Sequence, residues 1–305
     1  VSNSLTDIVR GANKGILSNS FDAETTNSSN GYLASFDSDG FTTANAGAYN
    51  NDNAKNYVSW NWLANGAGSA NTDGSISSTV SANTTSGFSI VKYTGTESLA
   101  TVGHGLGMAP KMILIKDLSY TRDWAVYHEA MGNTYGIYLN LTNAQGGGNS
   151  DFWGSTSPTS TVFTINTRNE NNNNGSNYIA YCFADVQGFS KMGSYFGNGN
   201  ADGPFSYTGF SPSFVMIKRA VGGTDNWVMY DNKRSPFNPA NENLAANATS
   251  ATNTGIKLDI LSNGFKCRVT EGNTNVSGNT YIYMAFAENP FVATSGTNAV
   301  PVTAR

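Results

Sequence analysis

Asn263-Gly264-Phe265, followed after a polar loop by Tyr281-Ile282-Tyr283-Met284-Ala285-Phe286, is the stretch that decides the fold, because the chain contains it in three versions. The other two join Asp39-Gly40-Phe41 to residues 57–62 and Val162-Phe163 to residues 178–183. The interval from Phe to Tyr is 16 residues in the versions that contain Phe41 and Phe265, and 15 residues in the version that contains Phe163. Short apolar runs of this kind, bounded by Gly and Asn, are typical of β-strands. The sequence therefore predicts a repeat protein built from strands.

A longer repeat surrounds two of these versions. The run from Pro110 to Lys116 recurs from Pro212 to Lys218, and Trp124 recurs as Trp227, so the offset stays near 102 (212 − 110 = 102; 227 − 124 = 103). A unit of about 100 residues with six or seven short strands has the size of a β-sandwich domain. We therefore predict an all-β fold of tandem antiparallel β-sandwich repeats, with complete units over residues 87–187 and 188–291.

The beginning of the chain matches only the second half of such a unit. Arg10 aligns with Arg234 and Phe41 with Phe265 at one constant offset (234 − 10 = 224; 265 − 41 = 224). Residues 1–65 are therefore predicted to be a partial β-sandwich repeat. Half a sandwich exposes strand edges and an apolar face, so we expect its missing strands to come from an upstream part of a longer precursor or from a neighbouring subunit.

Two further segments lack the repeat pattern. Residues 66–86 are rich in Gly, Ser, Thr and Asn and are predicted to be a linker that carries at most one edge strand. Residues 292–305 are predicted to be a C-terminal tail that frays or lies on a neighbour.

The composition excludes several classes of protein. Charged residues make up 12% of the chain, against about 25% in typical domains, and Asn, Ser, Thr and Gly replace them. With a net charge of −4 and a pI near 5.1, the chain lacks the basic surface that a nucleic-acid-binding protein needs. No apolar run approaches the length that crosses a bilayer, so a membrane partner is not expected.

Few residues fit catalytic or metal chemistry. Cys182 and Cys267 do not occupy equivalent positions and are predicted to be buried free thiols rather than a disulfide. The two histidines, His104 and His128, are not repeated as ligands, and no zinc spacing exists, so we expect no metal and no cofactor. No nucleophile or nucleotide motif occurs. Five acids could still meet in space as a catalytic pair: Asp123, Glu129, Asp225, Asp231 and Glu288. We nevertheless expect the protein not to be an enzyme.

The candidate binding residues are aromatic and amide side chains. Trp124 and Trp227 recur, as packing residues do, and are expected in the core. Trp153 and its neighbour Phe152 have no repeated partner and lie in a loop-like setting, so they are candidates for stacking on a sugar or a partner protein. Asn198, Asn200 and Asp202 lie in a long polar loop and complete the predicted surface-binding set; calcium in this loop is a lesser alternative.

Several motifs together resemble a known family. They are residues 56–62, residues 73–84, the run from Thr101 to Pro110, Tyr181-Cys182-Phe183-Ala184 and the run from Ala285 to Phe291. In this order they resemble a repeat domain of unknown function that is common in large structural proteins of marine tailed bacteriophages. Proteins of that family are usually labelled tail fibre or virion structural protein, so the resemblance implies a virion location and contacts with other virion proteins. It supplies no catalytic residues.

The expected function follows from the repeats and this resemblance. We expect a virion structural protein, as a tail fibre or appendage whose loops bind the host surface, with a surface glycan as the ligand. A fibre would be a homo-oligomer, with a trimer favoured. The alternatives are a capsid or tail decoration protein that clamps other virion subunits, and an extracellular glycan-degrading enzyme.

Overall fold

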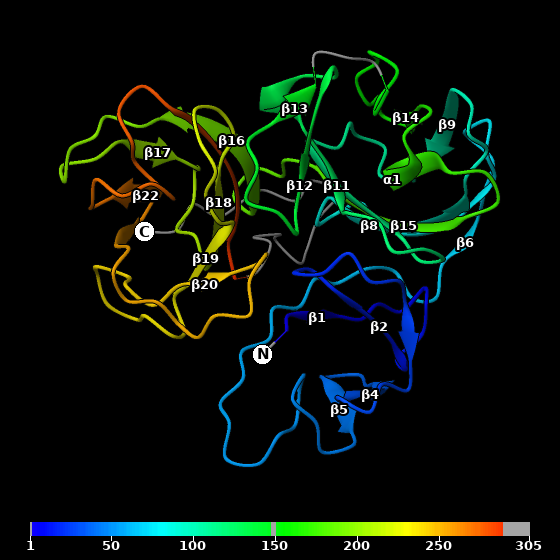
Figure 1. Cartoon of the computed structure of the whole chain (residues 1–305), viewed down its shortest axis with the longest axis horizontal. Coiled ribbons are helices and arrows are strands. Elements are labelled where there is room, and N and C mark those ends of the chain that lie inside the picture. Colours follow the sequence, from blue (N-terminus) through cyan, green and yellow to red (C-terminus); the bar gives the residue numbers. More distant parts are fainter. Residues whose placement is uncertain (1, 148–150, 289–305) are drawn as a thin grey trace, which may run out of the picture.

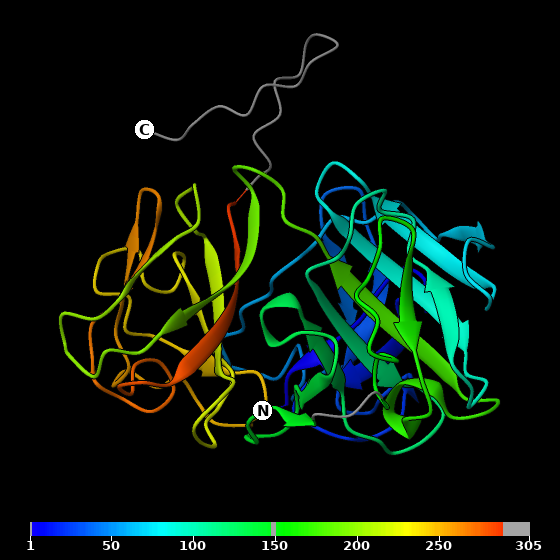
Figure 2. The same ribbon diagram turned by 90° about the horizontal axis from the view of Figure 1, so that it is seen from above.

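Three groups of strands lie around a common centre (Figures 1 and 2). The computed structural model describes residues 2–147 and 151–288, and the groups are formed by the first section (2–65), the middle section (66–187) and the last section (188–288). The named strands pair in antiparallel fashion. The predicted all-β class with antiparallel sheets is confirmed. The predicted tail, 292–305, lies outside the described residues.

The middle section contains one large sheet and one small sheet. Its strands are β6 (Ser69–Asn71), β7 (Ser78–Asn83), β8 (Phe88–Thr94), β9 (Ala100–Gly103), β10 (Met112–Asp117), β11 (Ala125–His128), β12 (Tyr135–Tyr138), β13 (Gly146–Gly147), β14 (Val162–Ile165) and β15 (Asn177–Phe183). The large sheet has the order β13-β12-β11-β10-β15-β8-β7-β6, and β14 pairs with β9. The short helices are η1 (Glu129–Met131) and α1 (Asn169–Asn172).

The large sheet is buried on both faces, which explains why its central strands are largely apolar. Alternate residues of a strand point to opposite faces. On β10, Met112 and Leu114 belong to a central core that contains side chains of all three sections. Ile113 and Ile115 belong to a second core, together with residues of β9 and β14. The sheet therefore separates the centre of the molecule from the interior of its own sandwich.

The last section repeats this arrangement. Its strands are β16 (Ser190–Phe196), β17 (Phe205–Tyr207), β18 (Phe214–Arg219), β19 (Val228–Asp231), β20 (Leu244–Ala245), β21 (Leu258–Leu261), β22 (Gly264–Cys267) and β23 (Thr280–Phe286). The sheet order β16-β23-β18-β19-β20 corresponds to β8-β15-β10-β11-β12, and β17-β22-β21 forms the facing sheet. The sequence boundary predicted at 187/188 falls between β15 and β16.

The first section contains a smaller set of strands, which are β1 (Ser4–Leu5), β2 (Lys14–Leu17), β3 (Thr25–Thr26), β4 (Tyr32–Phe36) and β5 (Phe41–Ala44). Their sheets have the orders β1-β2-β3 and β4-β5. A turn after β1 matches one after β19: Arg10 N–H donates to Asp7 Oδ1 at 2.9 Å, and Arg234 N–H donates to Asp231 Oδ1 at 2.8 Å. Both arginines also pair with these carboxylates. The local structure therefore follows the predicted register (231 − 7 = 224).

The prediction for residues 66–86 was wrong in its main point. This segment is not a linker, because it contributes β6 and β7 to the large sheet. Strand β7 pairs with β8 along its whole length, from Ser78 with Tyr93 to Asn83 with Phe88. Small Ser, Thr and Ala side chains suit this position because both faces of the strand are largely covered. A composition typical of linkers therefore also fits a closely packed strand.

An aromatic cluster occupies the centre of the molecule. Trp62, Phe183 and Phe286 come from the three sections and hold equivalent positions in the repeat. Their ring centroids are 6.1 Å apart for Trp62 and Phe183, 5.5 Å for Trp62 and Phe286, and 5.7 Å for Phe183 and Phe286. We call these three residues the central aromatic triad. Edge-to-face pairs at such distances are favourable beyond the apolar area that they bury.

Equivalent hydrogen bonds join each section to the next around this triad. They run from Trp124 Nε1 to Leu17 O, from Trp227 Nε1 to Tyr138 O and from Asn3 Nδ2 to Ala245 O, each at 2.9 Å. The first joins the middle section to the first, the second joins the last section to the middle, and the third joins the first section to the last. The three sections therefore form a closed ring. Trp124 and Trp227 are buried, as predicted.

Both cysteines are free and buried, as predicted. Burial raises the pKa of Cys182 to about 12 and that of Cys267 to about 11. Because the thiolate is the reactive form, both thiols are expected to be unreactive near neutral pH.

Replacing Trp62 tests the central aromatic triad. We expect Trp62→Ala to lower the free energy of unfolding by about 3 kcal/mol, because it leaves a cavity between Phe183 and Phe286. Urea denaturation measures this change. The matched control is Leu63→Ala: Leu63 is 77% exposed, and its truncation should change stability by less than about 0.5 kcal/mol. Equal effects of the two substitutions would contradict the role of the triad.

A pH-dependent loss of stability is expected from His128, which joins the middle and last sections. Its Nε2 donates to Tyr283 O at 3.2 Å, and its Nδ1 accepts from Ala130 N–H at 3.2 Å. Burial lowers the pKa of His128 to about 4, whereas an unfolded histidine has a pKa near 6.5. Above pH 6.5 the contribution of neutral His128 to the free energy of unfolding is fully present. As the pH falls from about 6.5 to 4, only the unfolded chain takes up the proton, so stability falls by up to about 3 kcal/mol.

The matched variant for this prediction is His128→Gln, which cannot titrate. Unfolding free energies of both proteins are measured by urea denaturation between pH 4 and 7. The difference between the two profiles isolates His128 from His104. Parallel profiles over this range would show that His128 does not cause the loss.

Candidate functional site

Trp153 and Phe152 do not form the predicted binding surface. They are 2% and 3% exposed and lie in the interior of the middle section. Trp153 Nε1 donates to Tyr135 O at 2.9 Å, and the Trp153 ring lies 5.5 Å from that of Tyr127. The Phe152 ring is covered by the guanidinium of Arg168 at 4.5 Å. The segment has no regular secondary structure, as predicted, but it folds over the core because its two rings fill the space beside β12.

Truncation of Trp153 distinguishes a packing role from the predicted role in surface binding. We expect Trp153→Ala to lower the free energy of unfolding by about 3–5 kcal/mol, since a fully buried indole is lost. Thermal and urea unfolding measure it. A stable, folded Trp153→Ala protein with less than about 1 kcal/mol of destabilisation would show that the side chain is not a packing residue.

Asn198, Asn200 and Asp202 are brought together on an exposed loop, as predicted. The loop joins β16 to β17 and is held from below by Asn275, which is 0% exposed. Asn275 Nδ2 donates to Asn198 Oδ1 at 3.1 Å and to Asn200 O at 2.7 Å, and Asn275 Oδ1 accepts from Asn198 N–H at 2.8 Å. The loop is therefore ordered by a buried amide that faces it.

Asn275 is a positioning residue that the sequence analysis missed. Its equivalent in the middle section is Asn172, which accepts from Thr96 N–H at 2.7 Å and donates to Ser98 O at 2.7 Å. Both asparagines precede a repeated tyrosine, Tyr281 or Tyr178, by six residues. This shared spacing was the available signal, but among so many asparagines it does not stand out.

Asp202 is paired with cations of the protein. Its Oδ1 lies 2.6 Å from Lys266 Nζ and 3.9 Å from Arg268 Nη1. The hydrogen bond and the charge of Lys266 lower the pKa of Asp202. Within residues 2–147 and 151–288, no group of three or more His, Cys, Asp or Glu side chains could hold a metal ion. The loop is better suited to neutral ligands than to calcium.

Strand β17 places exposed aromatic rings beside this loop. Phe205 and Tyr207 point to the outer face of β17 and are 45% and 65% exposed, and Phe196 at the start of the loop is 72% exposed. The Phe205 ring lies against Gly264, where an added Cβ would approach it to 2.9 Å. We call this set the β17 surface: Phe196, Asn198, Asn200, Asp202, Phe205 and Tyr207.

The middle section covers the corresponding surface. Strand β9 is equivalent to β17, and Ile76 forms a bridge to Val102 on its open side. Ile76 N–H donates to Thr101 O at 3.0 Å. Strand β17 is an edge strand in its sheet, and it carries rings where β9 has Thr101 and Gly103. The exposure of the β17 surface is therefore a specific feature of the last section.

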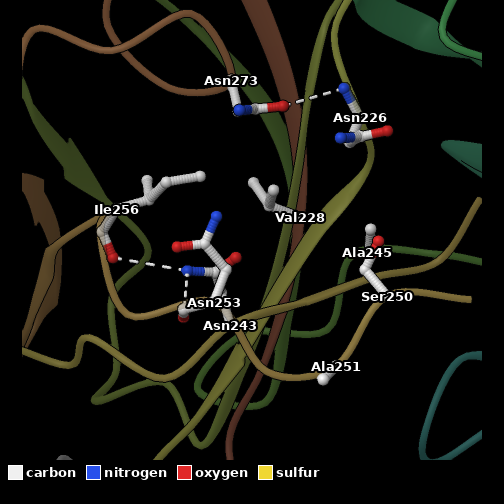
Figure 3. Close-up of a pocket in the computed structure, with 9 residues that line it drawn as sticks. All are labelled: Asn226, Val228, Asn243, Ala245, Ser250, Ala251, Asn253, Ile256 and Asn273. Atoms are coloured by element: carbon white, nitrogen blue, oxygen red, sulfur yellow. Dashed lines mark hydrogen bonds between the residues drawn. The ribbon is translucent and has the colours of Figure 1, made fainter. Parts of the chain in front are cut away.

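A second candidate site is a small pocket in the last section (Figure 3). The space between its walls, with the open solvent at its mouth included, is about 330 Å³. The lining residues are Asn226, Val228, Asn243, Ala245, Ser250, Ala251, Asn253, Ile256 and Asn273. Asn243 Nδ2 donates to Asn253 O at 2.9 Å, and Asn273 Oδ1 accepts from Asn226 N–H at 2.8 Å. None of the nine side chains is titratable, so this pocket is suited to binding a neutral polar group and not to acid–base chemistry.

The five acids considered as catalytic partners each bind a different group. Their partners are Asn140 for Asp123, Lys111 for Glu129, Arg219 for Asp225, Arg234 for Asp231 and Lys233 for Glu288. These contacts do not bring any two of the five carboxylates to a common partner. Glu271, whose pKa is raised mainly by burial, lies next to Asn273 and accepts its backbone N–H at 3.0 Å.

The histidines have structural surroundings. His104 is buried, its Nε2 donates to Thr159 O at 3.2 Å and its Nδ1 accepts from Leu106 N–H. Burial lowers the pKa of His104, as it does that of His128. Both rings are therefore neutral near pH 7 and are satisfied by backbone groups.

The chain belongs to the family of the domain of unknown function DUF7483, whose sequence profile matches residues 1–290. This one match spans residues of all three sections. No curated protein and no solved structure matches the chain. In the part of the chain that the structure describes, none of the helices is long and apolar enough to span a membrane.

Proposed function

We propose that this protein is a structural component of a virus particle that contributes to host attachment by binding a surface carbohydrate. The observation that carries the proposal is the β17 surface, where exposed rings lie beside an ordered loop of amide side chains. Exposed aromatic groups of this kind mark interaction sites. The resemblance of the sequence motifs to phage structural proteins supports the virion setting.

The chemistry of the β17 surface fits a glycan. A sugar ring offers C–H groups on its faces and hydroxyl groups around its edge, so it stacks on Phe205 or Tyr207 while amides hydrogen-bond its hydroxyls. Asp202 is already neutralised by Lys266. Because Asn275 orders the loop in advance, binding costs less conformational entropy than it would with a mobile loop.

The ring architecture fits the structural part of this function. Three sections share one core, which gives a rigid body that presents the β17 surface at a fixed position. The low charge limits salt-dependent attraction to the wrong surface. In this proposal the partners are other virion proteins, copies of the same chain in an oligomer, a trimer if the protein forms a fibre, and the host glycan.

A decoration protein is the second candidate function. The observation that favours it is that β17 is an edge strand, since such a strand can pair with a strand of another virion subunit. The two functions differ in where the chain lies on the particle. Imaging of particles with this chain labelled distinguishes a tail appendage from a position on the capsid or the tail shaft.

Substitution of both rings tests carbohydrate binding. We expect the double variant Phe205→Ser and Tyr207→Ser to bind polysaccharide from the host surface about tenfold more weakly, since two stacking contacts are lost. Affinity is measured by retention on immobilised polysaccharide. The matched control is Phe237→Ser, because Phe237 is 82% exposed and lies outside the β17 surface.

The proposal is wrong if the double variant binds as tightly as the unaltered chain, or if the unaltered chain binds no host-surface polysaccharide. Shortening of the polysaccharide during incubation would instead indicate a glycan-degrading enzyme.

A further inference from the structure

In both complete sections, one central strand pairs with a neighbour on each side. Strand β15 lies between β8 and β10, and β23 lies between β16 and β18. The residues of the first section that align with β23 are 57–62 (281 − 57 = 224). They belong to no sheet in the described part of the chain. The first section therefore contains the equivalent of a central strand without either of its neighbours.

Residues 57–62 nevertheless occupy the position of a central strand. Tyr57 Oη donates to Ala48 O at 3.1 Å and accepts from Asp52 N–H at 3.0 Å. The equivalent tyrosine on β23 makes the same two bonds: Tyr281 Oη donates to Gly272 O at 2.7 Å and accepts from Val276 N–H at 2.9 Å. All three positions keep one offset (281 − 57 = 272 − 48 = 276 − 52 = 224). Trp62, at the other end of the segment, belongs to the central aromatic triad.

Strand β1 has an open edge on the side that faces this segment in the repeat. Its equivalent, β19, pairs with β18 on one side and β20 on the other. Among the described residues, strand β1 pairs only with β2. The place that β18 fills in the last section, between β19 and β23, therefore holds no described strand between β1 and residues 57–62. We call this place the open strand position.

Two aromatic side chains show the consequence. Phe41 and Tyr57 are 38% and 41% exposed, whereas their equivalents Phe265 and Tyr281 are 0% exposed. In the last section, Tyr195 of β16 stacks on Tyr281 at 5.1 Å and meets Phe265 at 6.0 Å. The first section has the two outer members of this aromatic set and lacks the tyrosine between them.

The middle section shows that this arrangement is general. There Tyr93 of β8 stacks on Tyr178 at 5.2 Å and meets Phe163 at 6.1 Å. Both complete sections therefore cover the same two rings with a tyrosine from the strand that neighbours the central strand. The exposed rings of the first section consequently define the residue that would cover them.

We propose that the first section accepts a third copy of the strand set formed by β16, β17 and β18. A strand like β18 fills the open strand position. A strand like β16 pairs with the far side of residues 57–62 and places its tyrosine between Phe41 and Tyr57. A strand like β17 pairs with β5. The sequence of the covering segment is thereby defined. It contains a strand that carries a tyrosine, followed by a second strand whose apolar run leads to a lysine.

The geometry points to delivery of this segment through a loop that leads directly into β1. In the complete sections, β10 is joined to β11 by residues 118–124, and β18 is joined to β19 by residues 220–227. A lysine on the strand before each of these loops also binds the neighbouring section. Lys116 Nζ donates to Phe21 O at 3.1 Å and Lys218 Nζ donates to Thr142 O at 2.7 Å. The lysine next to the end of each such strand therefore joins its section to the preceding one.

Fusion of the chain's own residues 188–224 ahead of Val1 tests this proposal. The offset of 224 then places Val1 where Asp225 follows in the last section. We expect the fused chain to show a Tm raised by roughly 5 °C, and backbone amides of residues 57–62 to exchange at least about tenfold more slowly than in the unfused chain. Calorimetry and hydrogen exchange measure these changes.

The matched control carries Met216→Pro in the added copy only. Proline removes a ladder hydrogen bond from the middle of a strand that is paired on both sides, so this fusion should leave Tm and exchange near those of the unfused chain. A second fusion, residues 87–121 ahead of Val1, supplies the middle section's strands in the same register (122 − 1 = 121) and should give the same protection as the first.

Equal exchange in the fused, control and unfused chains overturns the proposal, as does failure of both fusions to protect residues 57–62. Slow exchange of these residues in the unfused chain, together with self-association measured by light scattering, also overturns it, because a second copy of the chain would then cover this face.

Discussion

The central aromatic triad is the contact on which the rest of the structure depends. Phe183 and Phe286 each end a central strand, Trp62 ends the equivalent segment of the first section, and each ring meets the other two. Three sections can bring these segment ends to one point only if each lies at a similar angle to its neighbours, which is the arrangement of a closed ring. The main-chain carbonyls of Leu17, Tyr138 and Ala245 then fall within reach of the adjacent section. Neutral hydrogen bonds of this kind contribute about 1 kcal/mol each, whereas the shared core supplies the larger part of the stability.

Buried lysines show the cost of this closure and how it is offset. Lys116 and Lys218 are fully buried, and burial lowers the pKa of each to about 8. A buried ammonium is tolerated only where its hydrogens find acceptors, and here carbonyl oxygens of two sections provide them. Each lysine therefore stabilises the joint between sections only when both sections are in place. This makes the joints specific as well as stable.

The sequence predicted the strands well because their pattern is local, and it could not predict the ring because that depends on contacts between unlike residues. Trp62 corresponds to phenylalanines, and Asn3 corresponds to Trp124 and Trp227, so closure leaves no repeated signature. Trp153 was misplaced for a related reason: lack of repetition suggested a surface role, but its ring fills a space that exists only in the middle section. The polar loop was located correctly from composition, since amide-rich loops favour the surface. Its anchor, Asn275, was hidden because burial of an amide cannot be recognised without its partners.

The aromatic residues of the first section and those of the last section are exposed for different physical reasons. Phe41 and Tyr57 occupy positions whose equivalents are interior in both complete sections, so their exposure reflects the strand set that the first section lacks. Phe205 and Tyr207 point outward from a sheet whose inner face, with Phe265 and Cys267, is already buried. In the middle section the equivalent edge of β9 is bridged by Ile76, and the described residues of the last section contain no counterpart of that bridge. Exposure by itself therefore does not identify a binding surface. For β17 the further argument is chemical. Phe205 and Tyr207 stand where β9 has Thr101 and Gly103, and the loop that Asn275 orders lies beside these two rings.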